Sequence, residues 1–236
     1  MEILKGIEIR DLALWIKPCL IIGDIHIGYE EALNKQGVLI PRFQFKEVLE
    51  RLERILQGIK PKKILINGDL KHEFGTISGQ EWRHTLQLLD FLAKHCGEVV
   101  LVKGNHDTVL GPIAEKRKVK VVDYAEIESK HGKMLVIHGD RIPEDVSPYW
   151  TIITGHEHPA VSLKEGPRVE LVKCFLVGKY KRKNLIVMPS FNLVVEGHDI
   201  LKERLYNPFI EDLANMVVYV VADKVYPFGK VKELIR

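Results

Sequence analysis

The chain has 236 residues, of which 46% are hydrophobic and 28% charged, and its formal net charge is +3 at pH 7. This length excludes a small scaffold that depends on disulfides or metals for its stability, and it predicts one globular domain over residues 1–236. The slight positive charge permits a nucleic-acid partner without indicating one.

The cysteine pattern and the hydropathy indicate a cellular environment. Three widely spaced cysteines argue against a disulfide framework and a thiolate zinc site, and they fit a reducing compartment. The apolar run 12–22 is interrupted by Lys17 and Pro18, unlike a secretory signal. No stretch reaches the roughly 18–20 apolar residues that a transmembrane helix needs. We therefore expect a cytoplasmic protein without a membrane partner.

The first half of the chain alternates predicted strands and helices. Three short apolar runs are typical of buried strands: 19–23, 63–67 and 98–103. Between them, apolar residues recur at helical spacing over 45–59. Ser78 and Glu81 have the spacing of a capping box, which predicts the start of a second helix. This alternation predicts a parallel sheet.

After residue 119 the pattern changes to strands, with only a short helical piece expected at 200–205. The expected strands cover 119–123, 133–138, 150–154, 169–177, 185–188 and 217–221. A strand-rich second half behind an alternating first half predicts an α/β (α+β) fold. In this fold, two packed mixed β-sheets are flanked by helices as a four-layer α-β-β-α sandwich.

Polar residues of metal-ligand type follow five of the predicted strands where each strand ends. These segments are Asp24-Ile25-His26, Gly68–His72, Gly104–Asp107, His138-Gly139-Asp140 and Gly155–His158. Because ligands of open α/β sheets collect at the carboxyl ends of strands, we expect the five segments to converge on one site. Their glycines allow sharp turns and leave room for a ligand.

The side chains in these segments indicate the kind of metal. Carboxylate, imidazole and amide oxygen together suit Mn²⁺, Fe²⁺ or Zn²⁺. About eight such groups are too many for one ion and suit two. Two ions about 3.5–4 Å apart clamp a phosphate and activate a water, which attacks phosphorus as hydroxide. A histidine outside the ligand set suits protonation of the leaving oxygen.

In their order along the chain, the five segments resemble the motifs of the calcineurin-like metallophosphoesterases. The family pattern is Asp-x-His, Gly-Asp, Gly-Asn-His-Asp/Glu, a lone His and Gly-His-x-His, and the match spans residues 23–158. The resemblance implies a first metal held by Asp24, His26, Asp69 and His158. It implies that Asp69 bridges to a second metal held with Asn105, His138 and His156. It also implies that His106 is the catalytic histidine facing the scissile phosphate.

The second motif indicates a subgroup. Serine/threonine protein phosphatases have Asp-Arg-Gly at this point, whereas Gly68–His72 is more similar to the Gly-Asp-Leu-Phe-His of SbcD-type DNA nucleases. In those enzymes the last histidine assists the catalytic one, so His72 is the candidate helper. The chain is too short to include their capping domain. It is most similar to the compact SbcD-related group, which includes the PdeM-like (ICC-like) phosphoesterases.

We therefore expect a dinuclear phosphoesterase with Mn²⁺ as the expected metal. The expected activity is that of a phosphodiesterase or nuclease on DNA, another nucleic acid or a nucleotide. One alternative is a small-molecule phosphomonoesterase on the same two metals. Another is a non-catalytic metal-binding scaffold, which is disfavoured because no ligand is missing. The oligomeric state stays open, with a dimer as one option.

The roles of three acidic residues within or beside the motifs are considered separately from those of the ligands. Asp107 and Asp140 either orient ligand histidines or bond to backbone in tight turns. Glu157, between two ligand histidines, is expected to point away from them.

Three basic runs, 60–63, 115–120 and 179–183, have solvated turns as the simple interpretation. Tyr180 offers a ring among cations, as grooves that bind nucleic acid do. If at least two runs flank the metal site, the nuclease interpretation gains support. Trp15 and Trp82 are expected in the core. The pair Tyr149-Trp150 precedes the final motif and either lines the pocket or packs in the core, and we expect the core.

Overall fold

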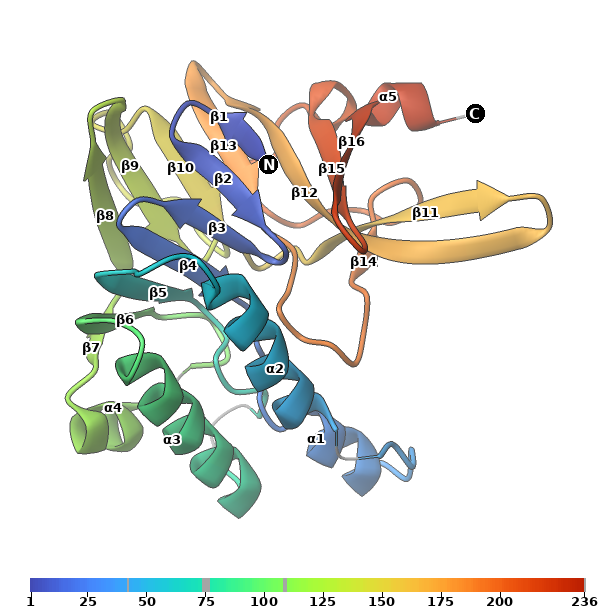
Figure 1. The fold of residues 1–236 in the computed structure, drawn as a ribbon. Helices are drawn as coiled ribbons and strands as arrows, with labels where there is room; N and C mark the ends of the chain where they lie inside the picture. The colour runs from blue at the N-terminus through green and yellow to red at the C-terminus, as the bar shows by residue number, and fades with distance from the viewer. Residues whose placement is uncertain (42, 74–76, 108–109, 236) are drawn as a thin grey trace.

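Two β-sheets packed face to face form the centre of the computed structural model, which describes residues 1–41, 43–73, 77–107 and 110–235 (Figure 1). Within these residues, seven strands form the first sheet in chain order. They are β1 (Glu2–Leu4), β2 (Ile7–Arg10), β3 (Ala13–Ile16), β4 (Cys19–Gly23), β5 (Lys63–Asn67), β6 (Glu98–Val102) and β7 (Lys120–Val122). Neighbours from β1 to β4 are antiparallel, and those from β4 to β7 are parallel.

The second sheet is also mixed, and nine strands of the described part of the chain belong to it. They are β8 (Tyr124–Ser129), β9 (Gly132–Ile137), β10 (Thr151–Thr154), β11 (Pro159–Glu165), β12 (Arg168–Tyr180), β13 (Lys183–Val187), β14 (His198–Asp199), β15 (Val217–Val221) and β16 (Val225–Lys230). Strands β9, β10 and β13 are parallel to one another, and β11 and β12 form a long projecting hairpin (Figure 1).

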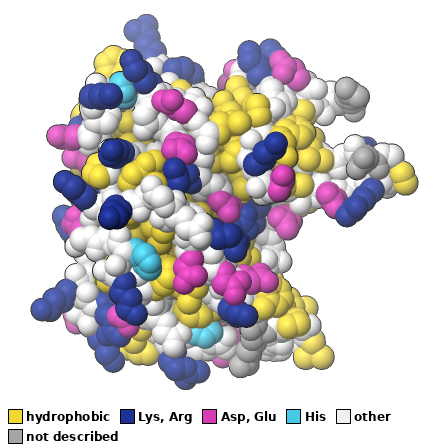
Figure 2. All heavy atoms as spheres, in the orientation of Figure 1, with side chains coloured by type: hydrophobic (Ala, Val, Ile, Leu, Met, Phe, Trp, Pro, Cys, Tyr) yellow, Lys and Arg dark blue, Asp and Glu magenta, His cyan; other side chains and the backbone are white. Residues whose placement is uncertain are grey.

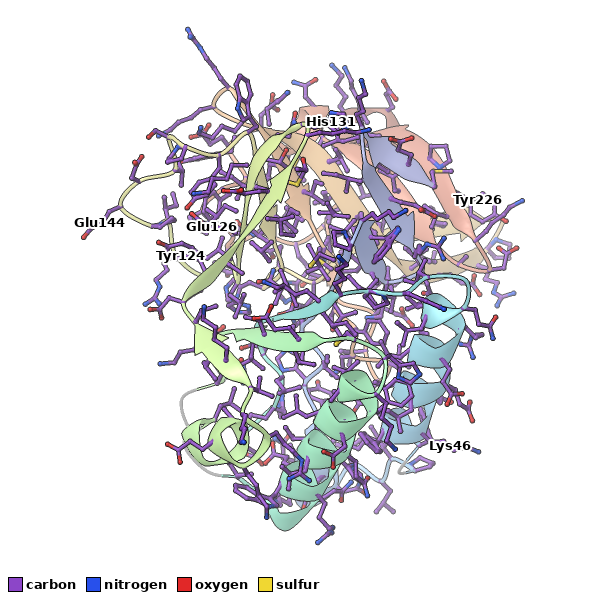
Figure 3. The ribbon with its side chains drawn as sticks, turned by 60° about the vertical axis from the view of Figure 1, so that its left-hand side comes forward. Lys46, Tyr124, Glu126, His131, Glu144 and Tyr226 are labelled. Atoms are coloured by element: carbon purple, nitrogen blue, oxygen red, sulfur yellow. The ribbon has the colours of Figure 1, made fainter. Side chains whose placement is uncertain are left out.

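Helices cover the outer face of the first sheet (Figure 1). They are α1 (Tyr29–Lys35), α2 (Gln44–Leu56), α3 (Gly79–Ala93) and α4 (Gly111–Arg117). Helix α2 is amphipathic: Val48, Leu52 and Ile55 are buried, whereas Lys46 points into solvent (Figure 3). Helix α3 begins at the expected capping box, in which Ser78 accepts from the Glu81 N–H and Glu81 accepts from the Ser78 N–H.

Strand β12 shows how the core divides on either side of the second sheet. Phe175 faces the first sheet, and Leu176 faces the opposite side. Segments near the C-terminus cover that opposite side, including Ile200, Phe209 and Val231 of α5 (Val231–Leu234). The predicted fold class, two sheets flanked by helices, is therefore confirmed, with an outer layer on the second sheet made mainly of loops.

Several sequence predictions about local structure were wrong. Residues 200–205 form turns because Asp199 accepts from the Leu201 N–H and Glu203 accepts from the Asp199 N–H, and such local bonds compete with helix. Tyr180 is no stacking platform, since its ring is buried against Phe209. In the pair expected in the core, Tyr149 is buried but Trp150 is 68% exposed.

The three basic runs lie at the amino ends of the parallel strands. Lys63 at the start of β5 pairs with Glu98 at the start of β6, and Lys120 opens β7. Lys183 likewise opens β13. The runs are thus at the opposite ends of the strands from the five polar segments. On the face shown in Figure 2, lysine and arginine side chains are interspersed with aspartate and glutamate.

Helix length and the state of the cysteines bear on the environment expected for the protein. Among the helices of the described ranges, none is long and apolar enough to cross a membrane. Cys19 and Cys174 are buried, Cys96 is half-buried, and all three are free thiols.

Replacing Ser78 with alanine removes the acceptor for the Glu81 N–H and the hydroxyl that donates to Glu31. We expect a loss of about 1 kcal/mol in the free energy of unfolding, measured by urea denaturation. Ser147→Ala, at an exposed serine that caps no helix, is the control. Equal midpoints for the two variants would contradict the role of this cap.

Candidate metal centre

The side chains expected as metal ligands follow strands of both sheets. Asp24 and His26 follow β4, Asp69 follows β5, and Asn105 and His106 follow β6. From the second sheet, His138 follows β9, and His156 and His158 follow β10. The loops stay in register beyond the strands: the Asp24 N–H donates to Gly68 O, the His26 N–H to Asp69 O, and the Gly155 N–H to His138 O.

One cluster contains Asp24, His26 and His158, whose ligand atoms lie within 4.8 Å of one another. The Nε2 atoms of His26 and His158 are 3.3 Å apart, and Nε2 of His158 is 3.6 Å from Oδ1 of Asp24. Asp24 is fully buried. Two nitrogens and one carboxylate oxygen therefore point at one common position.

A second cluster contains Asp69, His138 and His156. Nε2 of His138 is its centre, at 3.1 Å from Nδ1 of His156, 3.4 Å from Oδ2 of Asp69 and 2.8 Å from Oδ1 of Asn105. The same Oδ2 of Asp69 lies 3.7 Å from Nε2 of His26, in the first cluster. Asp69 therefore lies between the clusters, at the position that the family resemblance implies for a bridging ligand.

The donor set fits two divalent cations. Oδ1 of Asp24 is buried and has no hydrogen-bond partner among the described residues. Around Nε2 of His138 crowd one carboxyl oxygen, one amide oxygen and one ring nitrogen, and a single ring N–H can donate to only one of them. Imidazole nitrogen, carboxylate oxygen and amide oxygen are ligands of Mn²⁺, Fe²⁺ and Zn²⁺, and a cation offsets the mutual repulsion of such atoms.

Burial controls the protonation of the cluster in the metal-free protein. It raises the pKa of Asp69 to about 9, and the nearby Asp24 carboxylate acts in the same direction. Burial lowers the pKa of His138 to about 4 and that of His26 well below its usual value. For Asp24, burial is outweighed by His158 and the other histidines, so its pKa is lowered. Neutral His26 and His138 offer lone pairs to a metal.

The backbone is unusual at five of the expected ligands. Positive φ angles, a region that side chains other than glycine rarely adopt, occur at Asp24 (52°), His26 (49°), Asp69 (43°), His156 (66°) and His158 (49°). Such conformations cost energy and cluster at functional sites. They turn each side chain inward directly after its strand.

Glycines of the motifs leave space for the ligands. A Cβ atom at Gly104 would lie 2.2 Å from Oδ1 of Asp69, and one at Gly155 would lie 2.2 Å from Oδ2 of Asp24. A Cβ atom at Gly68 would lie 2.0 Å from Nδ1 of His138. The small residues predicted to leave room thus pack directly against ligand side chains.

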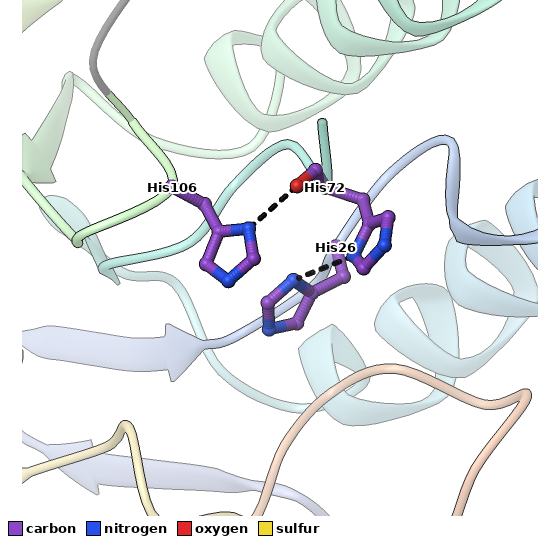
Figure 4. A group of neighbouring side chains, drawn as sticks. All are labelled: His26, His72 and His106. Carbon is purple, nitrogen blue, oxygen red and sulfur yellow. Dashed lines mark hydrogen bonds between the residues drawn. The ribbon is translucent and has the colours of Figure 1, made fainter. Parts of the chain in front are cut away.

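Two further histidines lie beside the clusters (Figure 4). The His106 ring donates from Nδ1 to the His72 carbonyl oxygen at 2.5 Å, which leaves Nε2 at 4.0 Å from Oδ2 of Asp69. Nδ1 of His72 is 3.5 Å from Nδ1 of His26, and the His72 ring stacks on that of His106 with centroids 5.5 Å apart. Burial lowers the pKa of His72 to about 4 and also lowers that of His106.

The acidic residues beside the motifs take different positions. Asp107 is buried and accepts from the N–H groups of Leu70 and Gly104, so it bonds to backbone in the turn. Asp140 is exposed. Glu157 points away from the clusters as expected, since it accepts from the N–H groups of Tyr206 and Asn207.

The sequence interpretation missed residues 190–192, which hold Asp24. Ser190 donates its hydroxyl to Asp24 O, the Asn192 N–H donates to the same oxygen, and the Phe191 N–H donates to Gly23 O. The run Met188-Pro-Ser-Phe-Asn192 follows β13 and was the available signal, because β13 is a third parallel strand of the second sheet that ends at this edge.

The model of the calcineurin-like phosphoesterase family matches residues 17–212. The chain belongs to this family. It is therefore a metal-dependent phosphoesterase, and its histidine and aspartate clusters are typical of the dimetal enzymes. The match extends beyond the five motifs, from the turn before β4 to the start of the 3₁₀ helix η1 (Leu213–Asn215).

Solved structures of the same fold include nuclease MPE from Pseudomonas putida. The TM-score is 0.63 at 21% identity, with 93% of this chain and 93% of that chain covered. The phosphoesterase Yfce from E. coli has a TM-score of 0.46 at 14% identity, covering 90% and 97%. Vps29 from Entamoeba histolytica, complexed with Zn²⁺, has a TM-score of 0.40 at 19% identity, covering 89% and 96%. No curated protein matches the chain.

Gly104→Ala places a methyl group against Asp69, since its Cβ would lie 2.2 Å from Oδ1 and 2.4 Å from the amide nitrogen. We expect a loss of about 1–3 kcal/mol in stability and a lower content of bound metal. Thermal unfolding and elemental analysis measure these effects. Gly79→Ala is the matched control, because its Cβ meets nothing closer than Arg83 Nη1 at 3.7 Å. Unchanged metal content in Gly104→Ala would refute the close packing.

Asp69→Asn tests the buried carboxylate. The pKa of Asp69 in the folded protein, about 9, lies far above 3.8, the ordinary value for an aspartate side chain. Its stability contribution is therefore fully present below pH 3.8 and is lost as pH rises through 9. We expect metal-free wild type to lose on the order of 1 kcal/mol per pH unit between pH 7 and 9, and the variant to lose less. Calorimetric melting in chelator measures this. The variant should also bind less metal at both positions, because the side chain that lies between the two clusters loses its charge.

Proposed function

We propose that this chain is a two-metal phosphodiesterase acting on a nucleic acid or a nucleotide. The observation that carries the proposal is the meeting of two histidine–carboxylate clusters at one shared carboxylate, Asp69, with His106 beside it. We treat residues 1–236 as one domain that works in the reducing cytoplasm, in keeping with its three free cysteines.

In this proposal each cluster holds one ion, with Mn²⁺ preferred over Fe²⁺ and Zn²⁺. The first ion is held by Asp24, His26, His158 and Asp69. The second is held by Asp69, Asn105, His138 and His156. When bound, such a pair polarises the phosphoryl group and generates a nucleophile from water at neutral pH.

His106 and His72 have separate tasks in the proposed reaction. The His72 carbonyl oxygen accepts from Nδ1 of His106 and thereby sets the direction of the ring. Nε2 of His106 faces the edge of the clusters, where we assign to it the contact with the phosphoryl group. Because Nδ1 already carries the proton donated to the His72 carbonyl, the ring acts as an acid in its imidazolium form, which gives the Nε2 proton to the leaving oxygen and returns to the neutral ring. His72 is a positioning residue, held in turn by its contact with His26.

Two observations support a diester as substrate. The segment Gly68–His72 is similar to that of SbcD-type nucleases and of the compact SbcD-related, PdeM-like group. The fold is shared with a protein described as a nuclease. The basic runs give no support, because they lie at the opposite ends of the strands from the metal centre.

Hydrolysis of an aryl phosphodiester and of the corresponding monoester, in Mn²⁺ and in chelator, tests the proposal. We expect Mn²⁺-dependent cleavage of the diester. His106→Ala should retain both metals and reduce turnover about 10²–10⁴-fold, the usual contribution of a positioned acid or base.

Each other outcome has a defined meaning. A preference for the monoester would favour a small-molecule phosphomonoesterase on the same two metals. Two bound metals without activity on either ester would favour a scaffold. Unchanged turnover in His106→Ala would remove His106 from the mechanism. Unchanged rates in chelator would contradict the assigned ligand set.

A further inference from the structure

Two buried charged side chains hold the partly exposed segment Val195–His198 against the metal centre. Glu157, in the loop after β10, is 1% exposed, and Lys173, in β12, is 5% exposed. Burying an ionised side chain is costly unless hydrogen bonds compensate it. Both side chains direct part of their hydrogen bonding to this one segment.

Glu157 stands between the ligand histidines His156 and His158, yet it bonds to neither. Its Oε2 accepts from the N–H groups of Tyr206 and Asn207, each at 2.7 Å. Its Oε1 accepts from Nδ1 of His198 at 3.0 Å. One carboxylate thus fixes both the chain beyond β14 and one edge of the His198 imidazole.

Lys173 of β12 fixes the same segment from the other side. Its ammonium group donates to Val195 O at 2.6 Å and to Glu196 O at 3.0 Å. Val195 and Glu196 are themselves exposed and contribute little apolar burial. The segment therefore keeps its place through these polar contacts.

These contacts fix the position of His198 beside His158, one of the expected metal ligands. Its N–H donates to His158 O at 2.9 Å, and its ring is nearly parallel to the His158 ring, at 27° and with centroids 6.4 Å apart. Gly197 allows this approach, because a Cβ atom there would lie 2.0 Å from His158 O. The His198 side chain is 44% exposed. It belongs to none of the ligand clusters found among the described residues.

We propose that His198 contacts the substrate, with its Nε2 atom hydrogen-bonding an oxygen of the second ester group of a bound phosphodiester. Glu157 uses Nδ1, so Nε2 is the polar atom left for a ligand. A monoester ends at the phosphate that the clusters hold, whereas a diester continues outward to where His198 stands. His198 is then a specificity-determining residue, and Glu157 and Lys173 position it. This inference rests on the proposed function.

Paired substitutions separate substrate contact from a structural role. The Asn side chain places its amide near the position of Nδ1 and can keep the bond to Glu157, but it has no group near Nε2. Gln reaches the position of Nε2. We expect His198→Ala and His198→Asn to lower kcat/KM for the aryl diester about 10-fold, mainly through KM, because a hydrogen bond to a charged group is lost. His198→Gln should recover part of the loss.

Control measurements accompany the kinetics. Manganese content should match wild type in all three variants, and the melting temperature should match in His198→Asn, which keeps the bond to Glu157, while His198→Ala loses that bond and melts lower. His95→Ala, at an exposed histidine at the end of α3, should have wild-type kinetics. Binding of a phosphinate analogue of the diester, which is anionic and has carbon in place of both ester oxygens, should weaken in the same order as KM rises when followed by calorimetry. The monoester rate should stay close to wild type.

Three outcomes would overturn the inference. They are wild-type diester kinetics in His198→Ala, retention in His198→Asn with loss in His198→Gln, and equal losses on diester and monoester. The last two would assign His198 a structural role. If wild type cleaves no diester in Mn²⁺, the proposed function itself fails, and that result is distinct because it appears before any variant is compared.

Discussion

Two carboxylates, Asp24 and Asp69, are buried within reach of the same imidazole, and this like-charge pair is the constraint on which the rest of the site depends. His138 lies 3.5 Å from an oxygen of Asp24 and 3.4 Å from an oxygen of Asp69. Burial, together with the nearby Asp24 carboxylate, raises the pKa of Asp69, so that without a cation one proton stays on the pair. The histidines offer lone pairs near these two carboxylates, the motif glycines leave room for the side chains, and the positive φ angles turn those side chains toward the centre. The same arrangement that strains the metal-free protein therefore selects divalent cations.

The centre spans the seam between the two sheets. Asp24, His26, Asp69 and Asn105 come from the first sheet, while the other expected ligands come from the second. Direct hydrogen bonds join the two sheets there: Asn67 donates to Ile137 O at 3.1 Å, and Ser190 donates to Asp24 O at 2.8 Å. The geometry of the expected ligands therefore depends on how the two sheets pack, since a shift of either sheet would separate the clusters. This dependence explains why buried polar groups are tolerated at the sheet interface.

Local patterns in the sequence, such as apolar runs and strand-end motifs, predicted the strands and the metal-ligand segments. Contacts between residues far apart in the sequence were missed. Strands 19–23, 63–67 and 217–221 have their predicted bounds, because continuous apolar runs need no context to be recognised. Lys17 and Pro18, which interrupt the apolar run 12–22, form the turn between β3 and β4. The grouping of the ligand residues followed from the rule about strand ends. Ser190, which bonds to Asp24, and Glu157, which bonds to His198, lie far from their partners in the sequence, so no spacing pattern predicts these contacts.

The positive φ angles at five of the expected ligands have a consequence for variation in this chain. Glycine or asparagine would relieve backbone strain at such positions, by about 1 kcal/mol or more each. A stability screen without metal should therefore favour replacements at Asp24, His26 and Asp69 that remove the ligand. At these residues, a replacement that raises thermal stability also lowers the affinity for metal. Engineering for heat resistance would have to leave these loops alone and seek its gains in the β11–β12 hairpin and the helices.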